Sequence, residues 1–194
     1  MCIRDSLLAV EGLVRYYVEK KDWAGVQRTL EAQVEAAESE EVRVKALLEL
    51  TSVAREDLCR NEDAIRYLLQ ITDLVPNHAQ AIGQLEKLLS AEDRWHDLVE
   101  VYEKNIAACR HAGGQTELVR SLMRTAEIWD RELGDTNAAV ASLEEVLANE
   151  PAHEAALLSL AGLHENARHG GRAKRFLNRC WPSNQHHRLT YCTV

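Results

Sequence analysis

The acid–base residue types of this sequence do not stand in catalytic arrangements. His96-Asp97 and His164-Glu165 are adjacent pairs, and neighbouring residues on a helix point in different directions, so neither pair predicts a catalytic dyad. The paired carboxylates Glu40-Glu41 and Glu144-Glu145 are typical of a solvated helix face. We therefore expect no catalytic residues and predict that the chain is not an enzyme.

The cysteines and glycines also lack the spacing that a metal or cofactor site needs. The C-terminal stretch 180–192 contains cysteines and histidines, but without the close C-x2–4-C or H-x3–5-H pairs of structural zinc sites. Cys59 and Cys109 have no histidine at helical spacing to activate them. Gly113-Gly114 follows no strand and precedes no Gly-Lys-Ser/Thr, which argues against a phosphate loop. We expect no metal and no cofactor.

The elements that would position any site are helices. The 194 residues include only nine glycines and three prolines, aromatic residues make up 5%, and no apolar run approaches the roughly 18 residues of a membrane span. Five apolar sets with the helical spacing i, i+3, i+4, i+7 begin at Val10, Leu47, Ile82, Leu122 and Leu157. These signals predict nine helices and no strand, at 6–20, 22–37, 41–58, 62–74, 78–91, 94–110, 116–132, 136–148 and 152–165.

The helices form an internal repeat. Residues 58–65 align with 133–140 at an offset of 75, and the same offset takes Pro76 to Pro151; a second alignment takes Trp23 to Trp95 at an offset of 72. Each superperiod of 72–75 residues splits into two helix pairs, because the apolar sets recur every 35–40 residues. The chain is therefore expected to be a stack of helix pairs.

Particular residues should fix the helix crossings and the helix ends. Ala64 and Ala139 are small residues where two helices would cross closely, whereas Leu98 takes this place in the third unit and puts the close packing there in question. Asn77 with Gln80 has the spacing of a capping-box variant. Residues 134–135 predict a C-terminal glycine followed by an N-cap aspartate.

These patterns resemble the tetratricopeptide repeat family. The matching residues are Ala64-x3-Leu68 with Pro76 and Ala139-x3-Leu143 with Pro151, and the paired degenerate repeats are similar to those of large bacterial members. The resemblance covers about residues 7–165 and implies an all-α solenoid of antiparallel helix pairs wound into a right-handed superhelix.

The family resemblance also implies a binding surface. Its members bind partners on a concave face lined by the first helix of each pair, at positions beside the apolar set. Carried onto this sequence, these groove positions are Glu11, Arg15, Lys45, Leu48, Ser52, Arg55, Gln80, Gly83, Lys87, Arg120, Met123 and Glu127. The candidate partner-binding residues among them are Lys45, Ser52, Arg55, Lys87, Arg120, Met123 and Glu127. The basic members would suit an acidic segment or a C-terminal carboxylate.

The charge distribution separates the functional alternatives. Residues 1–165 contain 17 basic and 31 acidic residues, a net charge of −14, which opposes binding to a phosphate backbone. We therefore favour a non-catalytic protein-interaction scaffold for a protein or peptide over an RNA-binding helical repeat, and expect no nucleic acid, membrane or small-molecule substrate. A regulatory repeat segment of a larger enzyme or signalling protein remains an alternative. By default, we expect the protein to be located in the cytoplasm.

Both ends of the chain differ from the repeats. Residues 1–6 resemble the translation of a transposase adapter used in sequencing libraries, and we interpret them as a scar. Residues 166–194 contain six basic residues and no acidic one, without regular periodicity. Out-of-frame translation explains this irregular basic tail most simply, and a genuine tail that meets an acidic partner is the alternative. We expect the tail to contribute little to folding.

Overall fold

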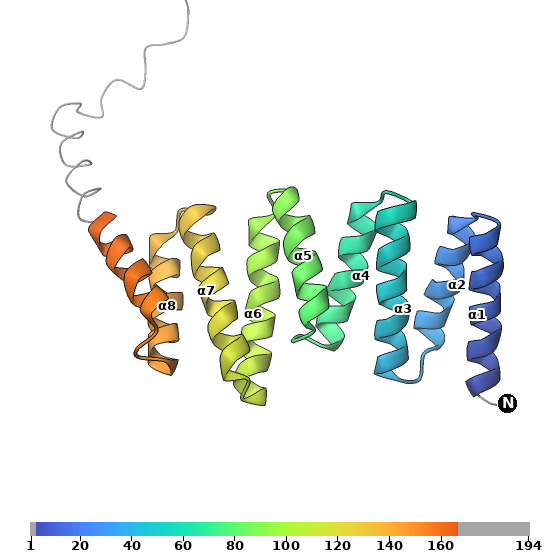
Figure 1. The fold of residues 1–194 in the computed structure, drawn as a ribbon, viewed down its shortest axis with the longest axis horizontal. Coiled ribbons are helices and arrows are strands. Elements are labelled where there is room, and N and C mark those ends of the chain that lie inside the picture. Colours follow the sequence, from blue (N-terminus) through green and yellow to red (C-terminus); the bar gives the residue numbers. More distant parts are fainter. Residues whose placement is uncertain (1–2, 167–194) are drawn as a thin grey trace, which may run out of the picture. The chain divides into compact units, whose positions relative to one another are not determined.

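A computed structural model describes the backbone of residues 3–166 and the side chains from Val10 to Asn166. All the regular elements in this part of the chain are helices, which confirms the all-α prediction (Figure 1). They are α1 (Ile3–Glu19), α2 (Trp23–Ala36), α3 (Glu40–Ser52), a short π-helix η1 (Val53–Asp57), α4 (Asn61–Leu74), α5 (Ala79–Ala91), α6 (Trp95–Ala112), α7 (Gln115–Arg131), α8 (Thr136–Asn149) and a last helix at 154–166.

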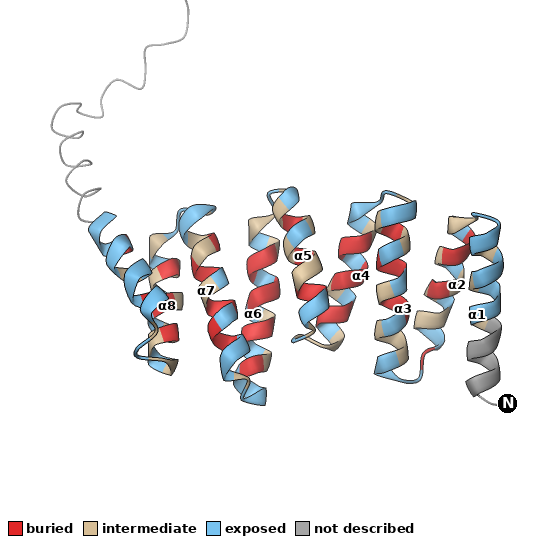
Figure 2. Ribbon diagram, viewed as in Figure 1, coloured by how far each residue is buried: buried red, intermediate tan, exposed pale blue. Residues whose placement is uncertain are grey.

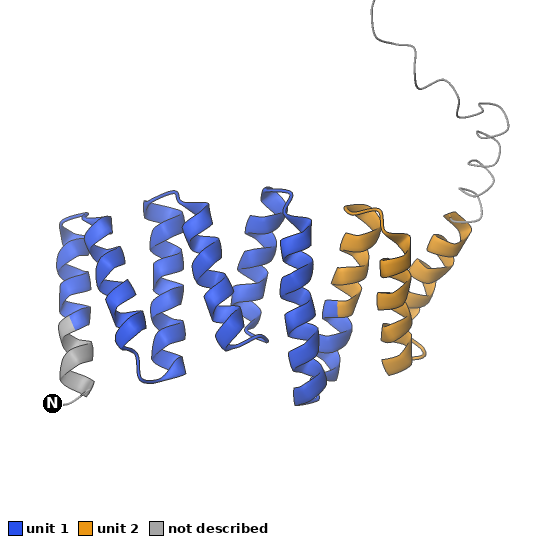
Figure 3. Ribbon diagram, turned by 180° about the vertical axis from the view of Figure 1, so that it is seen from behind, with its two compact units in different colours: residues 1–121 blue, residues 122–194 orange. Residues whose placement is uncertain are grey.

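The chain divides into two compact units, residues 1–121 and 122–194 (Figure 3). In unit 1, α1 to α6 lie side by side, and each helix runs antiparallel to the next (Figure 1). The second helices of neighbouring pairs, α4 and α6, also pack on each other. In unit 2, the C-terminal part of α7, α8 and the helix 154–166 are also antiparallel neighbours. The described helices thus form antiparallel pairs, and the helix 154–166 follows α8 as a further helix beyond these pairs.

Side chains cap the helix N-termini at equivalent positions. His78 precedes α5 and its Nδ1 accepts a hydrogen bond from the amide of Ala81 at 3.2 Å; His153 precedes the last helix and accepts one from Ala156 at 3.1 Å. The predicted capping role of Asn77 is therefore wrong, because the helix begins one residue later than the capping-box pattern requires. The predicted N-cap Asp135 is confirmed, since its carboxylate accepts from the two amides that follow Thr136.

The turns within the pairs repeat the same backbone geometry. Cys59 and Gly134, 75 residues apart, both have positive φ, of 53° and 67°. The amide of the residue after each donates to a carbonyl six residues back, that of Ala54 or that of Trp129, at 2.8 Å in both turns. The predicted C-terminal glycine is thus confirmed, and a cysteine takes its place in unit 1 without the conformational freedom that glycine has at positive φ.

The core lies between the helices of each pair and its neighbours (Figure 2). Ala64 and Ala139 have no exposed surface, as expected for close helix crossings, and Leu98 is also buried, so the larger residue is accommodated in the third unit. Three predicted apolar anchors are exposed: Leu13 is 49% exposed, Leu157 is 47% exposed, and Ala161 of the last set is exposed as well. The reason for Leu13 is that α1 packs on α2 alone among the described helices.

The helix predicted at 41–58 changes its winding before it ends. α3 stops at Ser52, and residues 53–57 form one π-helical turn closed by a 3.0 Å hydrogen bond from the amide of Leu58 to the carbonyl of Val53. The equivalent bond in unit 2 joins Leu133 to Ile128 at 3.1 Å. Apolar periodicity did not reveal this turn, because one wider turn barely alters which side chains share a face.

Candidate functional site

The groove positions of α5 border an open hollow on the surface of unit 1. The hollow has a volume of about 590 Å³, and α5 supplies its described lining. Three of the lining residues, Gln80, Gly83 and Lys87, are groove positions, and Ser90 continues the same helix face one turn further. Gly83 offers no side chain here, and a Cβ added to it would contact nothing within 4 Å, so the helix backbone borders open space.

A smaller recess lies in unit 2 at the corresponding face. Its volume is about 230 Å³, and it lies between α7 and the helix 154–166, with Leu143 of α8 also lining it. The α7 side contains the groove positions Met123 and Glu127, and the opposite side includes Ser159 and Gly162. Two hollows found in different units therefore coincide with positions chosen from the first helices of the pairs.

The four cationic groove positions differ in their surroundings. Lys45 and Lys87 are exposed, and no described side chain forms an ion pair with either ammonium group. Arg55 lies in the π-helix and contacts the carboxylate of Glu56 at 2.6 Å, and Arg120 contacts Glu117 at 3.1 Å. Exposed ion pairs of this kind contribute only about 0–1 kcal/mol to stability, so the guanidinium groups remain accessible to a stronger carboxylate ligand.

The remaining groove positions supply polar or neutral surface. Ser52 ends α3 and is exposed, Leu48 is half-buried, and Arg15 and Glu11 are exposed on α1. Glu127 forms an ion pair with Arg124 on its own helix. The groove positions of α3 and α5 in unit 1 are therefore more basic than those of unit 2, where carboxylates of Glu127 and Asp130 both line the recess.

The cysteines have structural surroundings. Cys109 is buried, and its thiol donates a 3.1 Å hydrogen bond to Oδ1 of Asn105. Burial raises the pKa of the Cys109 thiol, which favours the unreactive protonated form. Cys59 is exposed in the turn before α4. Within residues 10–166, the side chains of histidine, cysteine, aspartate and glutamate form no cluster of three that could hold a metal ion. The cysteines and histidines of 180–192, where the sequence predicts no metal site, lie outside the described residues.

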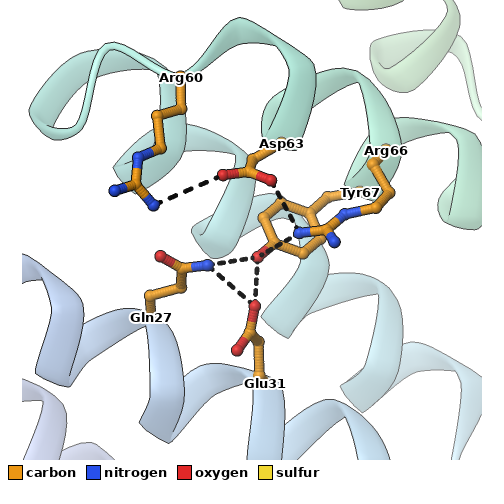
Figure 4. Close-up of polar contacts among 6 residues, drawn as sticks. All are labelled: Gln27, Glu31, Arg60, Asp63, Arg66 and Tyr67. Atoms are coloured by element: carbon orange, nitrogen blue, oxygen red, sulfur yellow. Dashed lines mark hydrogen bonds and ion pairs between the residues drawn. The ribbon is translucent and has the colours of Figure 1, made fainter.

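A partly buried polar network in unit 1 was not predicted (Figure 4). The hydroxyl of Tyr67 on α4 donates to Glu31 of α2 at 2.5 Å and accepts from Nε2 of Gln27 at 3.0 Å and from the guanidinium of Arg66 at 3.3 Å. Burial and the hydrogen bond to Glu31 raise the pKa of Tyr67 from 10.0 to about 12. The network joins α2 and α4, the second helices of neighbouring pairs, so its role is packing rather than ligand binding.

Ion pairs also connect α4 with α6 and with the residue that precedes α6. Lys104 of α6 contacts Asp73 of α4 at 2.9 Å, and this hydrogen bond raises the pKa of Lys104. Arg94, which precedes α6, contacts Glu62 of α4 at 3.1 Å. Two ion pairs thus connect α4 with α6 and its N-terminus. The unpaired lysines of α3 and α5 distinguish the first helices.

Residues 131–189 match the Tetratricopeptide repeat family. The match begins at the end of α7, covers α8 and the last described helix, and extends into residues that the structure does not describe. No curated protein sequence compared with the chain matches it. No helix in the described part is both long and apolar enough to cross a membrane.

The chain is also similar to solved structures of MamA. One crystal structure of MamA has 18% identity, covers 86% of this chain and 91% of its own, with a TM-score of 0.48. Another has 16% identity, coverage of 98% and 100%, and a TM-score of 0.49. A fragment from Desulfovibrio magneticus RS-1, MamA 41-end, has 16% identity, coverage of 90% and 96%, and a TM-score of 0.43.

The family match and the paired helices agree with each other. The residues that carried the resemblance, Ala139, Leu143 and Pro151, lie inside the matched range, and the counterparts of the first two, Ala64 and Leu68, are likewise buried in unit 1. The chain is therefore a repeat of paired helices that resembles the tetratricopeptide repeat family over residues 131–189.

Proposed function

We propose that this protein is a non-catalytic interaction scaffold that binds an acidic peptide or protein segment along the first helices of its pairs. The proposed contacts are Lys45, Ser52, Arg55, Lys87, Arg120, Met123 and Glu127. The observation that carries the proposal is the coincidence of the two surface hollows with these positions: Lys87 borders the hollow on α5, and Met123 and Glu127 border the recess of unit 2.

The charges of unit 1 support an acidic ligand. Lys45 and Lys87 are exposed on first helices and have no described ion-pair partner, in a chain whose first 165 residues carry a net charge of −14. An acidic segment would give each ammonium group a partner, whereas the surrounding carboxylates would repel the same segment at long range. Binding should therefore be modest, and it should weaken as salt is added.

The same surface favours a protein ligand over a small substrate. The hollow on α5 is wide and open, and neither hollow contains a group of titratable residues arranged for acid–base or nucleophilic chemistry. The two described cysteines are free, which suits a reducing compartment, and we propose the cytoplasm. A regulatory role within a larger protein would use the same binding surface.

Fluorescence anisotropy with a labelled hexaglutamate peptide tests the proposal. The double variant Lys45→Glu and Lys87→Glu should bind roughly tenfold more weakly, because it removes two exposed ion pairs of up to about 1 kcal/mol each. These lysines are preferable to Arg55 and Arg120, whose reversal would also place a new carboxylate beside Glu56 or Glu117.

The matched control reverses two exposed charges elsewhere in unit 1. Lys20→Glu and Arg28→Glu change the net charge by the same amount, in the first turn between helices and on the second helix α2. This control should retain most of the affinity. An equal loss in both double variants would mean that the peptide responds to overall charge alone, and the assigned surface would be wrong.

A further inference from the structure

Equivalent groove positions of the two units differ in charge. The turn after η1 and the turn after α7 repeat the same hydrogen bonds at an offset of 75, which places Asp130 at the position of Arg55. The same offset relates the histidine caps of α5 and the helix 154–166, and it places Gly162 at the position of Lys87. Unit 2 thus has a carboxylate and a missing side chain where unit 1 has two cations.

Both positions border the recess of unit 2, and all its described lining belongs to that unit (Figure 3). The floor is apolar, since Ala126, Leu143 and Leu163 are at most 5% exposed and still line it. A Cβ added at Gly162 would contact nothing within 4 Å, so the helix leaves the recess open there. Its volume of about 230 Å³ is smaller than the roughly 300–1,000 Å³ of small-molecule sites and suits a single side chain.

The described lining carries a net negative charge. Asp130 and Glu127 contribute two carboxylates, and Arg131 at the end of α7 contributes one cation. Glu127 pairs with Arg124, whereas no described side chain forms an ion pair with Asp130. Residues 122–166 together contain nine acidic and two basic residues. A cationic ligand is therefore attracted to unit 2 at long range, and Asp130 offers it an accessible carboxylate.

We propose that the recess of unit 2 binds a basic side chain, arginine or lysine, of a protein partner. The aliphatic stem would cover the apolar floor, while the cationic group would contact the exposed Asp130. Met123 supplies a flexible thioether that adapts to the stem. The inference rests on the proposed function, because Met123 and Glu127 are among its contacts. It narrows that function, since the bound segment is cationic at unit 2 and acidic at the lysines of unit 1.

Amide chemical-shift titration of the full chain with the peptide acetyl-Gly-Leu-Arg-Leu-Gly-amide tests the proposal. The largest shifts should occur around Met123, Asp130 and Gly162. The same peptide with citrulline, the neutral isostere of arginine, should bind about fivefold more weakly because it lacks the charge. Equal affinity for the two peptides, or shifts confined to unit 1, would overturn the proposal.

Two variants alter the recess in different ways. Asp130→Arg should weaken binding of the arginine peptide about tenfold, because attraction becomes repulsion. Gly162→Met should fill the recess and prevent binding without disturbing the helix, since a Cβ has free space there. The matched controls are Glu144→Arg, an equal charge change at an exposed position of α8, and Gly83→Met on α5, where a Cβ also has free space. Both controls should bind normally, and normal binding by Gly162→Met would overturn the proposal.

Hexaglutamate separates this inference from the proposed function. Asp130→Arg and Gly162→Met should retain hexaglutamate binding, because Lys45 and Lys87 are unchanged. A chain that binds the arginine peptide but not hexaglutamate would contradict the acidic ligand of unit 1 alone. A chain that binds only hexaglutamate would contradict the recess alone.

Two further measurements exclude other occupants. The triple variant Arg168→Gln, Arg172→Gln and Lys174→Gln should bind the arginine peptide nearly as the unchanged chain does; binding seen only in this variant would show that the chain's own basic residues occupy the recess. Sedimentation of Asp130→Arg should match that of the unchanged chain, and a dimer that this substitution dissociates would assign the recess to a second copy. Either result would overturn the proposal.

Discussion

Residues 53–81 of unit 1 and residues 128–156 of unit 2 have the same backbone geometry, but the side chains on their helix surfaces differ. The turn with positive φ, the six-residue hydrogen bond across it, the buried alanine and the histidine cap recur at an offset of 75. The helix surfaces differ, since α4 carries the buried Tyr67 with its polar network, whereas the equivalent Ser142 of α8 only donates to the carbonyl of Ala138.

This difference shows which residues specify the repeat and which are available for function. The shared groups satisfy backbone hydrogen bonds or occupy helix crossings, so a change there alters the fold in either unit. The charged and aromatic side chains differ between the units and are therefore the places where each unit acquires its own contacts. The following variants test this division by comparing equivalent positions.

Overpacking at the helix crossings should have the largest effect. Ala64→Leu and Ala139→Leu should each lower the free energy of unfolding by roughly 1–3 kcal/mol, because neither alanine has exposed surface and the extra atoms have no space. Urea denaturation measures the loss. Retained stability in Ala139→Leu alone would show that the crossing in unit 2 is not equivalent to that in unit 1.

Substitution of the two residues with positive φ should change the stability of the two units in opposite directions. Gly134→Ala should destabilise unit 2 by about 1–2 kcal/mol, since a Cβ meets nothing within 4 Å there and the cost is conformational. Cys59→Gly should stabilise unit 1 by a smaller amount, because glycine also gains freedom in the unfolded chain. Thermal melts measure both changes. Shifts of Tm in the same direction would show that the turns at Cys59 and Gly134 are not equivalent.

The histidine caps should contribute equally in the two units. His78→Ala and His153→Ala each remove the acceptor for one helix N-terminal amide and should cost about 1 kcal/mol. Asparagine at the same positions should restore most of this stability, as it is a preferred N-cap. Hydrogen exchange at Ala81 and Ala156 gives the local readout. Failure of asparagine to restore protection would mean that the imidazoles act through packing.

Alkaline pH should destabilise unit 1 through Tyr67. Its pKa is about 12 in the folded protein and 10.0 without burial, so the unfolded chain loses its proton first, and this contribution to stability is lost as pH rises from 10 to 12. Tyr67→Phe should flatten that part of the pH–stability curve and cost roughly 0.5–1.5 kcal/mol at neutral pH. An unchanged slope in Tyr67→Phe would exclude this tyrosine as its source.

The sequence predicted the parts of the fold that depend on periodicity. Apolar spacing located all the described helices within a few residues, and the offset of 75 located the turns at Cys59 and Gly134. It did not predict His78 as a cap, since histidine is a rare choice that only geometry reveals, nor the network of Tyr67 and Glu31, which are 36 residues apart. Periodicity identifies the faces of helices, whereas contacts between side chains depend on how the helices pack.

The candidate site was predictable only in outline. The family resemblance indicated the first helices, and spacing then gave positions such as Lys87 and Met123 that border the two hollows. The local ion pairs of Arg55 and Arg120 were not foreseen, because neighbouring opposite charges pair only when their rotamers permit.

The binding surface of unit 1 is tested most directly by amide chemical-shift mapping of the full chain during titration with hexaglutamate. We expect the largest shifts in α3 and α5, around Lys45 and Lys87, with smaller shifts in α4 and α6, whose charges pair with each other. The shifts around both lysines should diminish together as salt is added. Largest shifts in α4 and α6 would contradict the account and assign binding to the second helices.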